Sequence, residues 1–239
     1  WILRVDLTRQ EILREELNRA WAEDFLGQRG LATKYLAEEI DPAVDPLSPG
    51  NKLIFATGPM TGTMASTGGR WSAVTKGALT GAIAASNAGG FFGAELKFAG
   101  FDMVILEGRA PHPVYLMVRD DDVELMDARG FLWGESVWTT EERIRARHGD
   151  PQIRIASIGR AGENQVKYAC VVCDRDRAAG RSGVGAVMGS KNIKAVAVRG
   201  SRGVGVHDPN RFMEAVRRCR GKLDGHSARR QLMKRGTLP

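Results

Sequence analysis

The feature that most constrains the fold of this chain is a weak internal repeat that links glycine-rich stretches to apolar runs. Residues 93–108 align without a gap on residues 185–200, at an offset of 92 residues. Both segments begin with Gly-Ala, end in an apolar run, a charged residue and Gly, and follow a glycine-rich stretch. Because self-similarity at a fixed offset indicates repeated units, the sequence predicts two related halves, each with a glycine-rich turn followed by a helix.

Apolar runs elsewhere predict many short strands and a few helices. We expect strands at 1–7, 52–57, 71–75, 101–107, 113–118, 123–126, 153–158 and 194–199. Helical patterns cover 17–40, with a break at 27–30, and 136–148, with Thr139 or Thr140 as the N-cap; a further helix starts at Asp208-Pro209. Since these elements follow no strict βαβ order, the sequence predicts an α+β fold.

Three glycine clusters are the candidate binding elements, at residues 67–70, 86–90 and 176–185. Glycine lets the backbone approach a ligand closely, and successive N–H groups can then point at a phosphate. Arg70, Arg177 and Arg181 lie in or beside these clusters, where a guanidinium could bind phosphate or a flat heterocycle. The alternative is that the clusters are simple surface turns. Residues 183–189 have the spacing G-x-G-x-x-x-G, which excludes an ordinary dinucleotide site.

Charge is unevenly distributed along the chain. The net charge is +7, but residues from Arg199 onward hold eleven Lys and Arg against three Asp and Glu. The first 198 residues hold 24 basic against 25 acidic groups, so a nucleic-acid-binding domain is not indicated. We therefore expect one domain over residues 1–206 and a basic helical start of a second over 207–239. The chain begins at Trp1 rather than Met, and we expect it to belong to a longer polypeptide.

The three cysteines exclude a disulfide framework and favour a reducing, cytoplasmic setting. Cys170 and Cys173 could form half of a metal site, but core packing is the stronger interpretation because no further ligands follow at suitable spacing. The longest uncharged stretch, residues 77–94, contains five glycines, Ser86 and Asn87, so no membrane span is expected. The sequence offers no convincing Ser-His-Asp or Cys-His set.

Four long motifs resemble the N-terminal domain of the tungsten-containing aldehyde:ferredoxin oxidoreductases, and the similarity covers about residues 2–215. These motifs are residues 51–59 (NKLIFATGP), 66–70 (STGGR), 86–100 (SNAGGFFGAELKFAG) and 177–192 (RAAGRSGVGAVMGSKN). The resemblance implies a duplicated base domain that holds a tungsten-bispterin cofactor, namely two molybdopterins whose dithiolene sulfurs bind one tungsten. It also implies a magnesium ion between the two pterin phosphates, and a 4Fe-4S cluster bound by later domains.

The implied activity is oxidation of aldehydes to carboxylic acids, with electrons passed through the iron–sulfur cluster to ferredoxin or an electron-transfer subunit. The implied protein is an oligomer that binds neither nucleic acid nor membrane. Carried over motif by motif, the resemblance implies that one pterin is bound by Arg70, Asn87 and Gly89, and the other by Arg177, Ala178, Gly180 and Arg181. It further implies that the backbone carbonyls of Asn87 and Ala178 contact magnesium, and that no protein group ligates tungsten directly.

Two alternatives stay open at this point. A relative that reduces activated aromatic rings would keep the cofactor but change the reaction, whereas a scaffold subunit would hold the cofactor without catalysis. The sequence also departs from the family pattern, because Cys173 stands where Asn is expected and Ala78 where Pro is expected. Cys170 and Cys173 do not match the family's cluster-binding motif, and no catalytic acid or base can be named.

Overall fold

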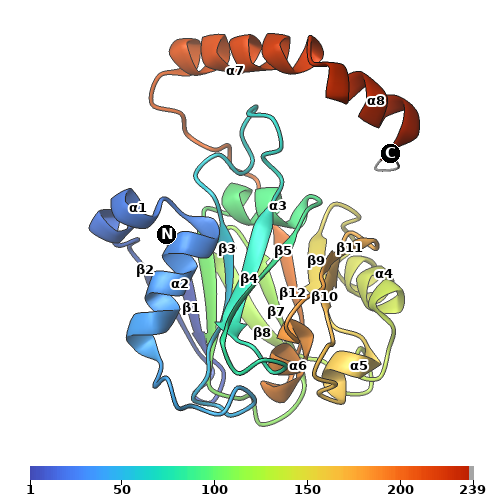
Figure 1. Cartoon of the computed structure of the whole chain (residues 1–239). Helices are drawn as coiled ribbons and strands as arrows, with labels where there is room; N and C mark the ends of the chain where they lie inside the picture. Colours follow the sequence, from blue (N-terminus) through green and yellow to red (C-terminus); the bar gives the residue numbers. More distant parts are fainter. Residues whose placement is uncertain (237–239) are drawn as a thin grey trace.

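Two six-stranded β-sheets share one apolar core in the computed structural model, which describes residues 1–236 (Figure 1). The first half of the chain forms a sheet with the strand order β2-β1-β6-β3-β4-β5. Its elements are β1 (Ile2–Asp6), β2 (Glu11–Glu15), α1 (Arg19–Phe25), α2 (Gln28–Glu39), β3 (Leu53–Thr57), β4 (Trp71–Lys76), β5 (Ile83–Ala88), α3 (Phe92–Phe98) and β6 (Met103–Glu107).

The second half repeats this plan. Its elements are β7 (Val114–Arg119), β8 (Asp122–Asp127), α4 (Val137–His148), β9 (Arg154–Ser157), α5 (Arg160–Glu163), β10 (Val171–Cys173), β11 (Arg177–Ala179), α6 (Val184–Ser190) and β12 (Ile193–Arg199). The second sheet has the order β8-β7-β12-β9-β10-β11, which matches the first strand for strand. Each sheet has one parallel pair, β1 with β6 and β7 with β12. The predicted α+β fold with two related halves is confirmed.

Alternating side chains divide the apolar residues among three cores. Leu3 and Val5 of β1 lie in the core shared by the two sheets, whereas Ile2 faces outward against α1 and α2. The outer face of the second sheet is covered by α4, whose Ile144 is fully buried. This alternation follows from the two-residue period of a strand. Helices or the other sheet thus cover both faces of each sheet. The edge strands remain accessible to other groups.

The helices α3 and α6 of the repeat lie between the sheets, at opposite ends of the shared core (Figure 1). The chain leaving each half runs past the helix of the other half. The amide of Arg202 donates to the carbonyl of Phe98 at 3.0 Å, and the amide of Ala110 donates to that of Lys191 at 3.1 Å. The two halves are thus joined by reciprocal backbone contacts.

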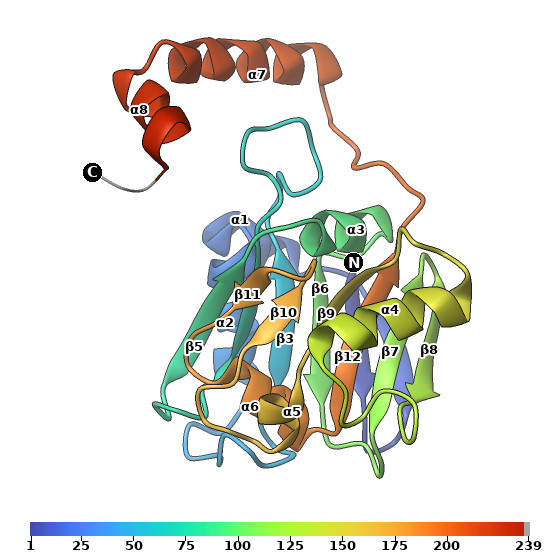
Figure 2. The ribbon, with the colours of Figure 1, turned by 90° about the vertical axis from the view of Figure 1, so that its right-hand side faces the viewer.

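Two helices, α7 (Pro209–Asp224) and α8 (Ser227–Arg235), stand away from the sheets (Figure 2). Asp208 caps α7 by accepting the amide hydrogen of Arg211 at 3.0 Å, as the sequence indicates. On α7, Val216 is buried but Cys219 is exposed. The boundary at residue 206 stays a prediction, and residues 237–239 lie outside the described residues. Within residues 1–236, no helix has both the length and the apolar character needed to cross a membrane.

The structure corrects two local predictions. Helix α4 begins after Ser136, whose side chain accepts the amide hydrogen of Thr139, so neither Thr139 nor Thr140 is the N-cap. Residues 86–88 and 177–179, expected to be turns, are the end of β5 and the whole of β11. Alanine, serine and asparagine give these strands no apolar signal, and they form because each pairs with a neighbouring strand of its sheet.

Candidate functional site

The predicted residues of the first half lie around the β4–β5 hairpin. Arg70 directly precedes β4, and Asn87 is in β5 opposite Ser72 of β4. The hydroxyl of Ser72 donates to Oδ1 of Asn87 at 2.5 Å, which fixes the amide side chain. Arg70 and Asn87 are both exposed, and both line an open hollow of about 700 Å³. The structure therefore brings these two predicted residues together.

The predicted residues of the second half lie at β11 and in the turn that follows it. Arg177 and Ala178 belong to β11, and all four predicted residues, Gly180 and Arg181 included, are exposed. These residues do not line the hollow that contains Arg70. They reach the first half through the contact between β5 and β11, the edge strands of the two sheets.

One hydrogen bond crosses this contact between the edge strands. The amide of Arg181 donates to the hydroxyl of Ser86 at 2.9 Å, directly beside Asn87. An edge strand leaves backbone groups on its outer side without a strand partner. The carbonyls of Asn87 and Ala178, which the family resemblance assigns to magnesium, thus belong to two edge strands in contact. Within residues 1–236, no group of three or more His, Cys, Asp or Glu side chains could hold a metal.

All three glycine clusters meet around Gly90. A Cβ on Gly69 would lie 2.7 Å from the carbonyl oxygen of Gly90, so these backbones touch. A Cβ on Gly90, which has a φ of +86°, would collide with the carboxylate of Asp174 and lie 3.1 Å from Cγ of Arg177. Only glycine combines this backbone conformation with such close neighbours. By contrast, a Cβ on Gly89 would meet no atom within 4 Å, so this residue borders open space.

The three predicted arginines have no ion-pair partner. Within the described part of the chain, no carboxylate lies within 4.0 Å of the guanidinium groups of Arg70, Arg177 or Arg181. Exposed arginines beside open glycine backbone suit an anionic ligand that makes charge-assisted hydrogen bonds. The residues present therefore fit a ligand with phosphate groups that spans both halves.

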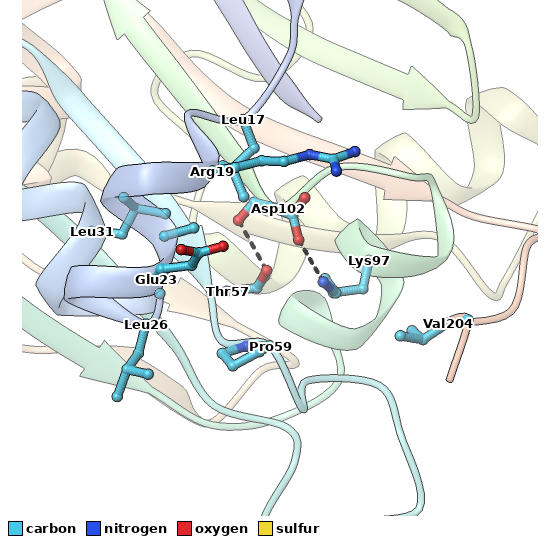
Figure 3. Close-up of a pocket in the computed structure, with 13 residues that line it drawn as sticks. Leu17, Arg19, Glu23, Leu26, Leu31, Thr57, Pro59, Lys97, Asp102 and Val204 are labelled. Carbon is cyan, nitrogen blue, oxygen red and sulfur yellow. Dashed lines mark hydrogen bonds and ion pairs between the residues drawn. The ribbon is translucent and has the colours of Figure 1, made fainter. Parts of the chain in front are cut away.

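A second hollow of about 460 Å³ adjoins the first but contains no predicted residue (Figure 3). Lys97 and Asp102 form an ion pair in it at 2.5 Å, and Thr57 donates to the Asp102 carbonyl at 2.9 Å. Burial alone would raise the pKa of Asp102, but Lys97 holds it below its usual value. The Asp102 carboxylate therefore serves as the partner of Lys97 in a structural ion pair rather than as a proton acceptor.

Sequence reasoning missed several residues of the site. The hollow that contains Arg70 is also lined by Gln28 and Arg29 at the start of α2, and by Met60. The only sequence signal for the α2 residues is the break in the helical pattern at 27–30. The contact of Asp174 with Gly90 spans more than eighty residues and leaves no local signal. The two cysteines of the region are free, with Cys173 buried and Cys170 half-buried.

Comparisons with known proteins identify the family of this chain. A model of the family "Aldehyde ferredoxin oxidoreductase, N-terminal domain" matches residues 2–200. The tungsten-containing aldehyde ferredoxin oxidoreductase of Pyrococcus abyssi is 55% identical over 222 residues, covering 93% of this chain and 36% of that protein. The Pyrococcus furiosus protein of the same name is 53% identical, with coverages of 92% and 36%. This chain thus spans little more than a third of these relatives.

Two proteins with other names are also similar to this chain. The aliphatic sulfonate oxidoreductase, WOR-like subunit, of Pyrococcus furiosus is 38% identical, covering 84% of this chain and 34% of that protein. The solved active site complex BamBC of benzoyl coenzyme A reductase, with 1,5-dienoyl-CoA, superposes with a TM-score of 0.91 at 38% identity, covering 93% of this chain and 34% of that chain. The chain therefore belongs to the aldehyde ferredoxin oxidoreductase family, a family of oxidoreductases, and matches its N-terminal domain.

Proposed function

We propose that this chain supplies the cofactor-binding base of a tungsten-dependent enzyme that oxidises aldehydes to carboxylic acids. The observation that supports this most directly is that Arg70, Arg177 and Arg181, none of which has an ion-pair partner within residues 1–236, lie in or beside glycine clusters at the contact of the two halves. Sequence identities of 55% and 53% to two tungsten-containing aldehyde ferredoxin oxidoreductases favour an aldehyde as the substrate.

Each predicted residue has a distinct role in this proposal. Arg70, Arg177 and Arg181 bind the phosphates or pterin edges, while Gly89 and Gly180 let the ligand approach the backbone. The carbonyls of Asn87 and Ala178 would hold a magnesium ion. When bound, the tungsten-bispterin group supplies two-electron redox chemistry. The chain's own residues hold and orient that group, and we assign none of them a proton-transfer role.

The remaining parts of the proposed enzyme lie outside this chain. A 4Fe-4S cluster would receive the electrons and pass them to ferredoxin or to an electron-transfer subunit, and the aldehyde pocket would be completed by later domains. Residues 207–239 would begin the first of these domains. The relatives named as a subunit and as a two-protein complex support an assembly with further protein partners.

The test is elemental and pterin analysis of the complete gene product, together with an aldehyde assay that uses a viologen dye as acceptor. We expect about one tungsten and two pterins per chain and dye reduction with aldehydes. Arg181→Ala should lose most of the bound tungsten, because a phosphate or pterin edge loses its cation. Arg129→Ala is the matched control: Arg129 is also exposed, but it follows β8 at the opposite edge of the sheet. Absence of tungsten, molybdenum and pterin from the wild type would refute the proposal.

A second function is favoured by the structural match to the benzoyl coenzyme A reductase complex. In that case the same cofactor surface would serve the reduction of an activated aromatic ring. Parallel assays with aldehydes and with an aromatic coenzyme A thioester distinguish the two, because only the matching substrate would exchange electrons with the dye. A protein that retains pterin but turns over neither substrate would instead be a non-catalytic cofactor-binding subunit.

A further inference from the structure

Asp174 of the second half holds a turn of the first half at residues 89–92. Its Oδ2 accepts the amide hydrogen of Phe91 at 2.6 Å and also that of Phe92 at 3.4 Å. Its side chain is 11% exposed. A short bond from a backbone amide to a carboxylate is a charge-assisted hydrogen bond and is stronger than a neutral one. Asp174 therefore fixes the backbone directly after Gly89 and Gly90.

Two neighbours of Asp174 contact the same turn. The thiol of Cys173 donates to the carbonyl of Gly89 at 3.5 Å. The guanidinium of Arg154 lies 4.8 Å from the centre of the Phe91 ring and 3.6 Å from Oδ1 of Asp174. Burial raises the pKa of Cys173 to about 12, so the thiol keeps its proton and remains a donor. Three side chains of the second half thus contact three residues of the first, namely Gly89, Phe91 and Phe92.

The β10–β11 turn that presents Asp174 is itself strained and supported. Asp174 and Arg175 have φ values of +47° and +64°, which residues other than glycine rarely adopt. The buried Glu141 accepts the amide hydrogen of Arg175 at 2.9 Å and so stabilises this conformation. Strained backbone of this kind persists only where surrounding contacts determine it, and it is common at functional sites.

The held turn also contacts Arg177 and the residue that precedes Arg70. Gly90 touches the backbone of Gly69, next to Arg70, and the side-chain stem of Arg177. A shift of residues 89–92 would therefore displace groups that both halves present to the ligand. We propose that Asp174 is the positioning residue of the cofactor surface: by holding residues 89–92, it keeps the binding groups of the two halves in one arrangement. This inference rests on the proposed function.

The experiment uses the complete gene product as purified, with four variants. Asp174→Ala removes the acceptor, while Asp174→Asn keeps a neutral acceptor. We expect Asp174→Ala to retain less than about a third of the wild-type tungsten and pterin, and Asp174→Asn to rescue part of the loss. Hydrogen exchange at the amides of Phe91 and Phe92 should become about tenfold faster in Asp174→Ala, because the bond that protects them is gone.

Asp176→Ala and Asp176→Asn are the matched controls. Asp176 is exposed in the same turn, and within residues 1–236 its carboxylate has no ion-pair partner. Loss of a negative charge alone would strengthen the binding of an anionic ligand in all four variants, which is opposite to the expected loss. If Asp174→Ala does not fold, the comparison of Asp174→Asn with Asp176→Asn decides.

The outcomes separate this inference from the proposed function. Faster exchange at Phe91 and Phe92 together with wild-type tungsten and pterin content in Asp174→Ala overturns the positioning role and leaves the proposed function standing. If hydrogen exchange at the amides of Phe91 and Phe92 is unchanged in Asp174→Ala, the contact between Asp174 and these amides is overturned. A wild-type protein without tungsten, molybdenum or pterin overturns the proposed function, and the positioning role with it, even if the exchange rates change as expected.

Discussion

At the scale of single residues, Lys191 has the most unusual environment. Its ammonium group is fully buried and donates to the carbonyls of Asn51 and Gly108. Burial lowers the pKa of Lys191 to about 7. In the unfolded chain the pKa returns toward its ordinary value of about 10.4, so between these values the unfolded state binds more protons. The free energy of unfolding should therefore rise with pH across that range.

The measurement is the thermal unfolding midpoint of the wild type and of Lys191→Met between pH 6 and pH 9.5. The unfolding midpoint of the wild type should rise relative to that of Lys191→Met from about pH 7 upward. Below pH 7 the difference between the two midpoints should stay constant. Lys76→Met measures the effect of losing a half-buried lysine that also donates to two carbonyls. A difference that is flat from pH 6 to pH 9.5 would show that the Lys191 amine stays charged.

Sequence analysis predicts some individual residues of the site and misses others. Glycine and arginine in one cluster predict a binding surface because both residue types serve the same ligand chemistry. The structure brings Arg70 and Asn87 to one hollow and joins Arg181 to Ser86, yet the roles of these residues stay predictions. Asp174 escapes sequence reasoning because an isolated aspartate between strands is an ordinary turn residue. Its partners become visible only when the two halves are folded together.

At the scale of elements, the start of α4 offers a direct test. Ser136 accepts the amide hydrogen of Thr139 at 3.1 Å and so satisfies one of the free donors at the helix end. Ser136→Ala should lower the free energy of unfolding by about 1 kcal/mol, while Ser136→Asp should leave it nearly unchanged because aspartate also caps. Thermal unfolding of both variants checks this. Equal losses in the two variants would mean that the cap does not stabilise the helix.

The elements that sequence patterns predict are those with a strong apolar period. The predicted runs at 52–57 and 71–75 become β3 and β4, because buried strands need apolar side chains on both faces. Sequence patterns miss the edge strands β5 and β11, since their alanine-rich sequences carry no strong apolar signal. Their strand form depends on pairing with β4 and β10, which is a property of the sheet rather than of the local sequence.

At the scale of the whole molecule, the duplication predicted from the repeat extends to packing. Gly93 in α3 and Gly185 in α6 occupy equivalent positions, at the repeat's offset of 92 residues. A Cβ on Gly93 would lie 3.0 Å from Cβ of Trp71, the first residue of β4 in its own half. A Cβ on Gly185 would collide with the carbonyl of Cys170, which directly precedes β10. The same helix face thus packs on the equivalent hairpin in both halves.

Alanine at either position should therefore destabilise the fold, and the loss should be larger for Gly185→Ala. The clash is closer at Gly185, where the Cβ would overlap a carbonyl oxygen, than at Gly93, where it would lie 3.0 Å from Cβ of Trp71, so we expect about 2–3 kcal/mol for Gly185→Ala and about 1 kcal/mol for Gly93→Ala. Gly221→Ala is the control, because a Cβ there meets no atom within 4 Å and alanine favours helix α7. Chemical denaturation of the three variants provides the measurement. A stabilised Gly185→Ala would show that α6 does not pack on its hairpin as α3 does, and the equivalence of the two halves would then stop at strand order.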